Sequence, residues 1–103
     1  MDLLSFKESL SGNEPPQNSS IYLNALWHDA RGEWDKAHEL IQDVPDMDAS
    51  WIHAYLHRKE GDDPNAGYWY SRAGKKRCIL SLDKEWEEIV QAFLHSEKTY
   101  PGI

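Results

Sequence analysis

The sequence predicts an all-α protein in which two helix–turn–helix hairpins stack on each other and a C-terminal helix caps the stack. Three observations support this fold class. Apolar residues recur at steps of three and four in successive segments, which is the spacing of one helix face. A shift of 29 residues places Gly32 over Gly61 and brings further small and apolar residues into register. No alternating apolar and polar run between turn signals predicts a strand.

The first 18 residues are expected to form an N-terminal segment with its own linker. Leu3, Phe6 and Leu10 have a helical spacing and predict one or two amphipathic turns. Residues 11–20, SGNEPPQNSS, combine glycine, a Pro-Pro pair and small polar residues, so neither helix nor strand can continue through them. We therefore divide the chain into residues 1–18, the N-terminal segment and Pro-Pro linker, and residues 19–103, the helical-repeat domain.

Four helices are expected next, and local signals set their limits. Ser19 or Ser20 can cap the first of them, and Pro45 stops the second. Pro64 suits the first turn of the fourth, where its missing N–H is not needed. The expected helices cover residues 21–30, 34–44, 49–59 and 64–73.

A longer amphipathic helix is expected over residues 82–97. Its apolar face carries Leu82, Trp86, Ile89, Val90, Phe93 and Leu94. Charged residues, Glu85 among them, are expected on the opposite face. Because two repeats are rarely stable alone, we expect this helix to cap the second hairpin.

The 29-residue shift also pairs Ala25 with Ala54 and Ala37 with Ala66. An alanine in the middle of each helix lets two antiparallel backbones approach closely. The glycines that follow the first helix of each hairpin permit the left-handed conformation that ends a helix. Such a period is typical of a stacked helical array.

These residues resemble the tetratricopeptide and Sel1-like repeats. The first copy matches at Ala25, Gly32, Glu33, Trp34 and Ala37, and the second at Ala54, Gly61, Asp62, Ala66, Tyr70 and Ala73. The string AGYWYSRAG is similar to the second helix of a Sel1-like unit. The period is shorter than in tetratricopeptide repeats, and Asp63 and Pro64 stand where an aromatic residue is usual. The resemblance implies the fold and does not identify a partner.

A narrower resemblance concerns residues 53–74, HAYLHRKEGDDPNAGYWYSRAG, together with WDKAHELIQD at residues 34–43. These strings resemble a family of small uncharacterised proteins. The resemblance implies a shared role for the string and does not name it.

Composition limits the classes of partner. The chain has 103 residues and a formal net charge of -7, which argues against a nucleic-acid or anionic-membrane surface. The one cysteine, Cys78, cannot form an internal disulfide, and no apolar run approaches the roughly 20 residues that span a bilayer. Residues 1–10 do not read as a secretory signal. We expect a cytoplasmic protein, and we expect no cofactor.

His53 and His57 are the candidate metal ligands. They lie four residues apart on one predicted helix, so they project from the same face, a spacing that can bind a divalent metal. A third ligand would have to come from elsewhere, such as His28, His38 or Glu60. The alternatives are that the histidines pack between the helices, where related repeats place aromatic residues, or that they are exposed to solvent.

The charged and aromatic residues around the turn of the second hairpin can also be interpreted in two ways. Arg58 and Glu60 belong to a charged run that is either an acid–base cluster or the charged end of a hairpin, with Asp62 or Asp63 capping the next helix. Tyr68, Trp69 and Tyr70 are consecutive, and helical residues point about 100° apart, so at least one should be exposed.

Two surfaces are candidates for contact with a partner. An exposed aromatic residue of the triplet beside Arg72 would be a binding hot spot. The second surface is the inner face of the first helix of each hairpin, with Tyr22, Leu26 and Asp29 in one and Trp51, Tyr55 and Arg58 in the other. Arg72, Lys75, Lys76 and Arg77 either bind phosphate or RNA, or complement a helix dipole and pair with acids of the last helix or of residues 43–48.

The function that the sequence favours is a protein-interaction or scaffold module for a protein or peptide partner, with self-association as one form of it. The alternative is a small-molecule or metal site, in an enzyme or a binding protein, around His53 and His57. No catalytic residue is assigned, because no phosphate loop, nucleophile elbow or paired-cysteine motif is present.

Overall fold

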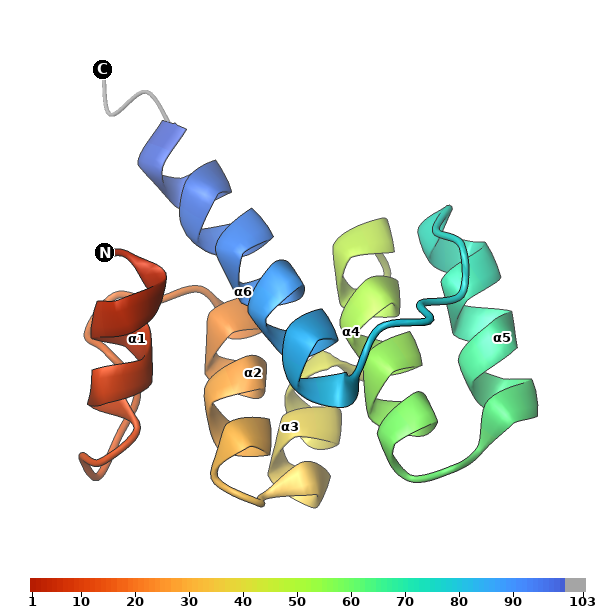
Figure 1. The fold of residues 1–103 in the computed structure, drawn as a ribbon, viewed down its shortest axis with the longest axis horizontal. Helices are drawn as coiled ribbons and strands as arrows, with labels where there is room; N and C mark the ends of the chain where they lie inside the picture. The colour runs from red at the N-terminus through yellow and green to blue at the C-terminus, as the bar shows by residue number, and fades with distance from the viewer. Residues whose placement is uncertain (100–103) are drawn as a thin grey trace.

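The computed structural model describes residues 1–99, with side chains through residue 96. These residues form six helices and no strand, which confirms the all-α class (Figure 1). The helices are α1 (Leu3–Ser9), α2 (Ile21–Ala30), α3 (Trp34–Ile41), α4 (Met47–Lys59), α5 (Asp63–Ala73) and α6 (Leu82–Thr99).

Side-chain caps explain where three of the helices begin. The side chains of Ser20, Asp46 and Asp62 accept hydrogen bonds from backbone amides in the first turns of α2, α4 and α5. Asp46 therefore starts α4 two residues earlier than expected. In contrast, α3 ends at Ile41 and not at Val44. The proline at position 45 disfavours helical geometry in the residue before it, so the chain leaves the helix early.

Helices α2 and α3 pack as one pair, and α4 and α5 as another. The turns inside the two pairs are built alike: the amides of Glu33 and Asp62 donate to the carbonyls of His28 and His57, each at 2.9 Å. Gly32 has φ 81° and the glycine 29 residues later has φ 87°, a backbone region open mainly to glycine. The alanines expected at the helix contacts, Ala25, Ala37, Ala54 and Ala66, are fully buried.

The last helix lies elsewhere than the sequence suggested. Its backbone neighbours are α1, α2 and α4, so it crosses the first helices of both pairs and does not cap the second pair alone (Figure 1). Its apolar stripe explains the position, since Ile89 and Val90 are fully buried in the same core cluster as Leu26 and Tyr55. The indole N–H of Trp86 donates to the carbonyl of Leu26 at 2.9 Å.

The N-terminal helix belongs to this core despite the Pro-Pro linker. Phe6 is fully buried, and its ring lies 6.0 Å from that of Trp86. The indole N–H of Trp27 donates to Ser9 Oγ at 3.2 Å, and Arg31 donates to two carbonyls of residues 10–12. The polar linker therefore leads into a docked helix.

Candidate functional site

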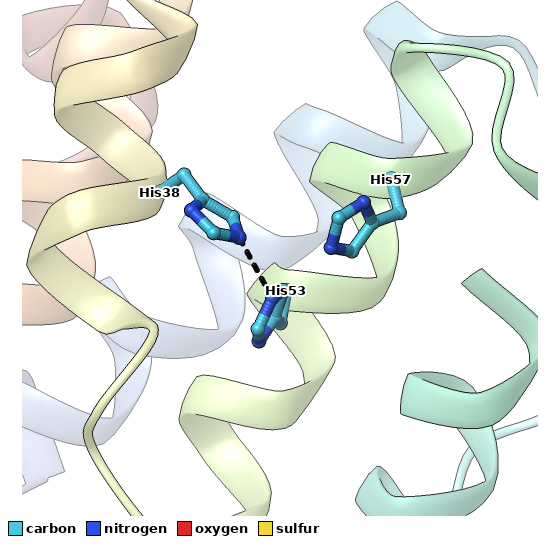
Figure 2. A group of neighbouring side chains, drawn as sticks. All are labelled: His38, His53 and His57. Atoms are coloured by element: carbon cyan, nitrogen blue, oxygen red, sulfur yellow. Dashed lines mark hydrogen bonds between the residues drawn. The ribbon is translucent and has the colours of Figure 1, made fainter. Parts of the chain in front are cut away.

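Three histidines meet between α3 and α4. His53 and His57 lie one turn apart on α4, and His38 of α3 turns toward them (Figure 2). One candidate ligand atom from each ring lies within 4.8 Å of the other two. The Nε2 atoms of His38 and His53 are 2.9 Å apart and share a hydrogen bond. Of the third ligands considered from sequence, the structure brings His38 to the pair, while Glu60 contacts only His57.

Two tryptophans enclose the histidines. The ring of Trp34 stacks on His38 at 4.9 Å with planes 10° apart, and that of Trp69 stacks on His53 at 3.9 Å with planes 17° apart. Both tryptophans are half-buried, and the Trp34 indole N–H donates to the carbonyl of Leu56 at 2.8 Å. The histidines thus pack among aromatic rings, and their nitrogens lie close together.

A carboxylate orients the third histidine. His57 Nδ1 lies 2.6 Å from Glu60 Oε1, and in the first hairpin His28 Nδ1 lies 2.7 Å from Glu33 Oε1. An ionised carboxylate only accepts, so Nδ1 of His57 carries the proton in this bond, and in the neutral ring the lone pair is then on Nε2. His28 has the same type of partner but does not belong to the three-histidine cluster.

Burial favours the neutral form of two of the three histidines. It lowers the pKa of His53 from its ordinary value near 6.5 to about 4, helped by the nearby His38 and His57. The pKa of His38 is lowered too, mainly by burial and then by His57. A hydrogen bond between two imidazole nitrogens requires one of them to accept, so at least one ring of the His38–His53 pair is neutral.

The expected inner groove is not open. Leu26 is fully buried and Tyr55 is 2% exposed, while Tyr22 stacks on Phe93 of α6 at 4.9 Å and Trp51 lies 6.1 Å from the same ring. The expectation that these residues line a partner groove is therefore corrected. The apolar stripe of α6 packs against these side chains in one core cluster.

The aromatic triplet of α5 divides as helix geometry requires. Tyr70 is 2% exposed and Trp69 is half-buried, whereas Tyr68 is 53% exposed, which confirms that one of the three faces solvent. The exposed Arg72 donates to the Tyr68 hydroxyl at 3.2 Å, and its guanidinium carbon lies 5.8 Å from the Tyr68 ring and 5.5 Å from the Trp69 ring. These three residues form one outward face of α5, the α5 face.

Basic residues continue from the α5 face into the segment that follows. Lys75 Nζ lies 4.1 Å from the Trp51 ring, and Arg77 lies 3.7 Å from the carboxylate of Asp63. Lys76 is exposed. The expected pairing with acids of the last helix or of residues 43–48 is absent among the described residues, because the chain turns these side chains toward α4 and the start of α5.

Two buried carboxylates were not foreseen. Glu85, expected on the exposed face of the last helix, is 1% exposed. Its carboxylate accepts from Arg58 Nη1 at 2.7 Å and from the Tyr70 hydroxyl at 2.5 Å. Asp29 is 1% exposed and accepts from the Tyr55 hydroxyl and Lys59 Nζ, each at 3.0 Å. Arg58 therefore joins α4 to α6.

The charged residues at the end of α4 each make a separate contact within the fold. Arg58 holds Glu85, Glu60 holds His57, and the Asp62 carboxylate caps α5. The sequence around Glu85 does not predict its burial, because both of its hydrogen-bond partners lie on other helices.

Within residues 1–99, none of the helices combines the length and the apolar composition that a bilayer crossing needs. Comparisons of the chain with protein-family models, curated proteins and solved structures find no match.

Proposed function

We propose that this chain is a protein-interaction module that binds an acidic segment of a partner protein on the α5 face, Tyr68, Trp69 and Arg72. One observation carries the proposal: α5 has only α4 as a backbone neighbour among the described helices, and its outward side presents a half-exposed tyrosine beside an arginine. Tyrosine, tryptophan and arginine are the residues in which binding energy concentrates at interfaces.

The charge distribution argues for an acidic partner. The chain as a whole carries -7, yet Arg72, Lys75, Lys76 and Arg77 place four cations within six residues at the end of α5. Neither Arg72 nor Lys76 takes part in an ion pair among the described side chains. A basic patch on an acidic protein attracts and orients acidic segments, while the net charge repels nucleic acid.

The scaffold that holds this face is, in our proposal, a short array similar to tetratricopeptide and Sel1-like repeats. The two hairpin turns with the same hydrogen bonds, 29 residues apart, support it. Partners of such arrays usually bind the inner face, which α6 covers in this chain. We therefore assign partner binding to the outer side of the second hairpin, on α5. The single cysteine fits a reducing compartment, so we place the protein in the cytoplasm.

Selection from a library of random peptides displayed on phage tests the proposal with the full chain as bait. We expect the enriched peptides to be rich in Asp and Glu. In fluorescence anisotropy, Tyr68→Ala and Arg72→Ala should each weaken binding of an enriched peptide by about 10-fold or more, the scale of a hot-spot residue. Lys36→Ala removes one exposed positive charge from α3 and is the matched control, with binding expected to stay within about 2-fold.

Two outcomes would overturn the proposal. One is enrichment of peptides without acidic bias, or no enrichment at all. The other is equal weakening by Arg72→Ala and Lys36→Ala, which would reflect net charge and not a site. If sedimentation velocity finds a dimer that Arg72→Ala dissociates, the acidic segment is supplied by a second copy.

A further inference from the structure

We propose that His38, His53 and His57 bind one divalent transition-metal ion of the kind that imidazole nitrogen prefers, such as Zn²⁺, Co²⁺ or Cu²⁺. Trp69 of the α5 face stacks on His53, but the candidate ligands come from α3 and α4, and the inference does not depend on the proposed function. It rests on the convergence of three of the chain's five histidines, from two helices, with a candidate ligand atom of each within 4.8 Å of the other two. Figure 2 shows the three rings turned toward the space between α3 and α4.

The distances are close to those of a coordinated ion. Metal–nitrogen bonds of about 2.0–2.1 Å in a tetrahedral arrangement place the nitrogens about 3.3–3.4 Å apart. The Nε2 atoms of His38 and His53 are 2.9 Å apart, so this pair would open by about 0.4 Å. The most distant pair lies within 4.8 Å and would close by at most about 1.5 Å, a movement within reach of small side-chain rotations.

The protonation of the cluster also suits a metal. In the His38–His53 hydrogen bond, one Nε2 carries a proton and the other a lone pair. Binding requires the donor ring to exchange its proton from Nε2 to Nδ1, which leaves a neutral imidazole that can coordinate. When both rings of the pair are neutral, neither has to lose a net proton, and the ion replaces the hydrogen bond between them.

Glu60 is a positioning residue in this proposal. Its carboxylate lies 2.6 Å from His57 Nδ1, and its side chain is 39% exposed. Histidines that bind metals typically donate their other N–H to a carboxylate, which fixes the tautomer and raises the basicity of the coordinating nitrogen. Here that contact leaves Nε2 of His57 as the coordinating atom.

The ligand set determines the kind of ion. Three imidazoles and no carboxylate favour Zn²⁺, Co²⁺ and Cu²⁺ over Mg²⁺ and Ca²⁺, which prefer oxygen. Three protein ligands leave the fourth position of a tetrahedral ion to water or another small ligand. A second group, His57 with Glu60 and Asp62, shares one histidine, but Glu60 already holds His57 and Asp62 caps α5.

The location gives the ion a structural consequence. His38 lies on α3 of the first pair of helices, whereas the other two lie on α4 of the second pair. A bound ion would join the two pairs at the contact between α3 and α4. Helix α3 has only eight residues and no side-chain cap, so it is the element that such a link would stabilise most.

The test is metal titration of the full chain after treatment with EDTA. Native mass spectrometry counts ions per chain, a competing chromophoric chelator gives the zinc affinity, and the visible spectrum of Co²⁺ reports tetrahedral coordination. We expect one ion per chain. His38→Gln should weaken zinc binding by at least about 100-fold, and Glu60→Gln by about 10- to 100-fold.

His28→Gln is the matched control, because His28 has the same carboxylate contact and lies outside the cluster. Its zinc affinity should stay within about 2-fold of the unaltered chain. Far-UV circular dichroism checks that each variant is folded, and the half-buried His38 is the ligand least required by the core. The proposal is overturned if no stoichiometric ion binds, if Ca²⁺ competes equally, or if His38→Gln binds as well as His28→Gln. Loss in Glu60→Gln alone would assign the ion to the other group and would also overturn it.

Discussion

Replacing Phe6 by alanine should destabilise the whole protein and not only its N-terminal helix. Phe6 lies in a segment that a Pro-Pro linker joins to the rest of the chain, yet its side chain is fully buried in the main core cluster. The truncation would leave a cavity beside Trp86, whose ring lies 6.0 Å away. A helix that only rested on the surface would not transmit this loss to the global unfolding transition.

The magnitude follows from complete burial. Truncation of a buried phenylalanine to alanine costs about 3–5 kcal/mol, which combines the lost transfer energy with the cavity left behind. A domain of this size is stable by only about 5–15 kcal/mol, so the variant should lose a large part of its stability. Leu4→Ala is the matched control on the same helix, because Leu4 is 65% exposed and should cost less than about 0.5 kcal/mol.

Urea unfolding followed by tryptophan fluorescence and by circular dichroism measures both variants. The two probes should report one transition, with the Phe6→Ala midpoint well below that of Leu4→Ala. If Phe6→Ala costs less than about 1 kcal/mol, or equals the control, the N-terminal helix does not belong to the core and the reasoning fails.

Three further predictions concern the rest of the core. Ala66→Leu should overpack the fully buried contact between α4 and α5 and cost about 1–3 kcal/mol, and an unchanged urea midpoint would contradict that contact. Glu85→Gln should lower the free energy of unfolding by about 3 kcal/mol, because it leaves Arg58 without its charged partner. Glu87→Gln, which removes one member of an exposed ion pair, should lower it by less than about 1 kcal/mol. Similar urea midpoints for the two variants would refute the argument from burial. With EDTA present, the free energy of unfolding should fall by up to about 3 kcal/mol as the pH is lowered from 6.5 to 4. The reason is that His53 binds a proton in the unfolded chain in this range but stays largely neutral in the folded protein. A flat profile, or the same slope in His53→Gln, would exclude this cause.

Helix limits could be predicted from the sequence because their causes are local. Ser20 caps α2 and Gly74 ends α5 in the left-handed conformation. The errors are local as well: Asp46 caps α4 earlier than expected, and Pro45 ends α3 before Val44. Each of these signals acts within a few residues of the chain.

The position of α6 and the burial of Glu85 could not be read in this way. The apolar stripe of α6 predicted a buried face without saying which helices it covers. Glu85 looks like a surface residue until Arg58, 27 residues away, and Tyr70, 15 residues away, meet it. A buried charge of this kind depends on tertiary neighbours, which periodicity does not contain.

In the candidate sites, too, the sequence predicted local features but not contacts between helices. The spacing of His53 and His57 predicted that they share a face, but only the packing of α3 against α4 brings His38 within 2.9 Å of His53. Helix geometry predicted one exposed aromatic residue beside Arg72. It could not choose Tyr68, because that choice depends on which side of α5 contacts α4.

An NMR titration of ¹⁵N-labelled protein with an acidic peptide from the selection tests directly whether the α5 face binds acidic segments. The backbone signals of Tyr68, Trp69 and Arg72 and the indole signal of Trp69 should shift first and most, and added salt should reduce the shifts. Shifts centred on Tyr22 and Trp51, under α6, would mean that the peptide displaces α6 from the inner face, and would contradict the assignment of binding to the α5 face.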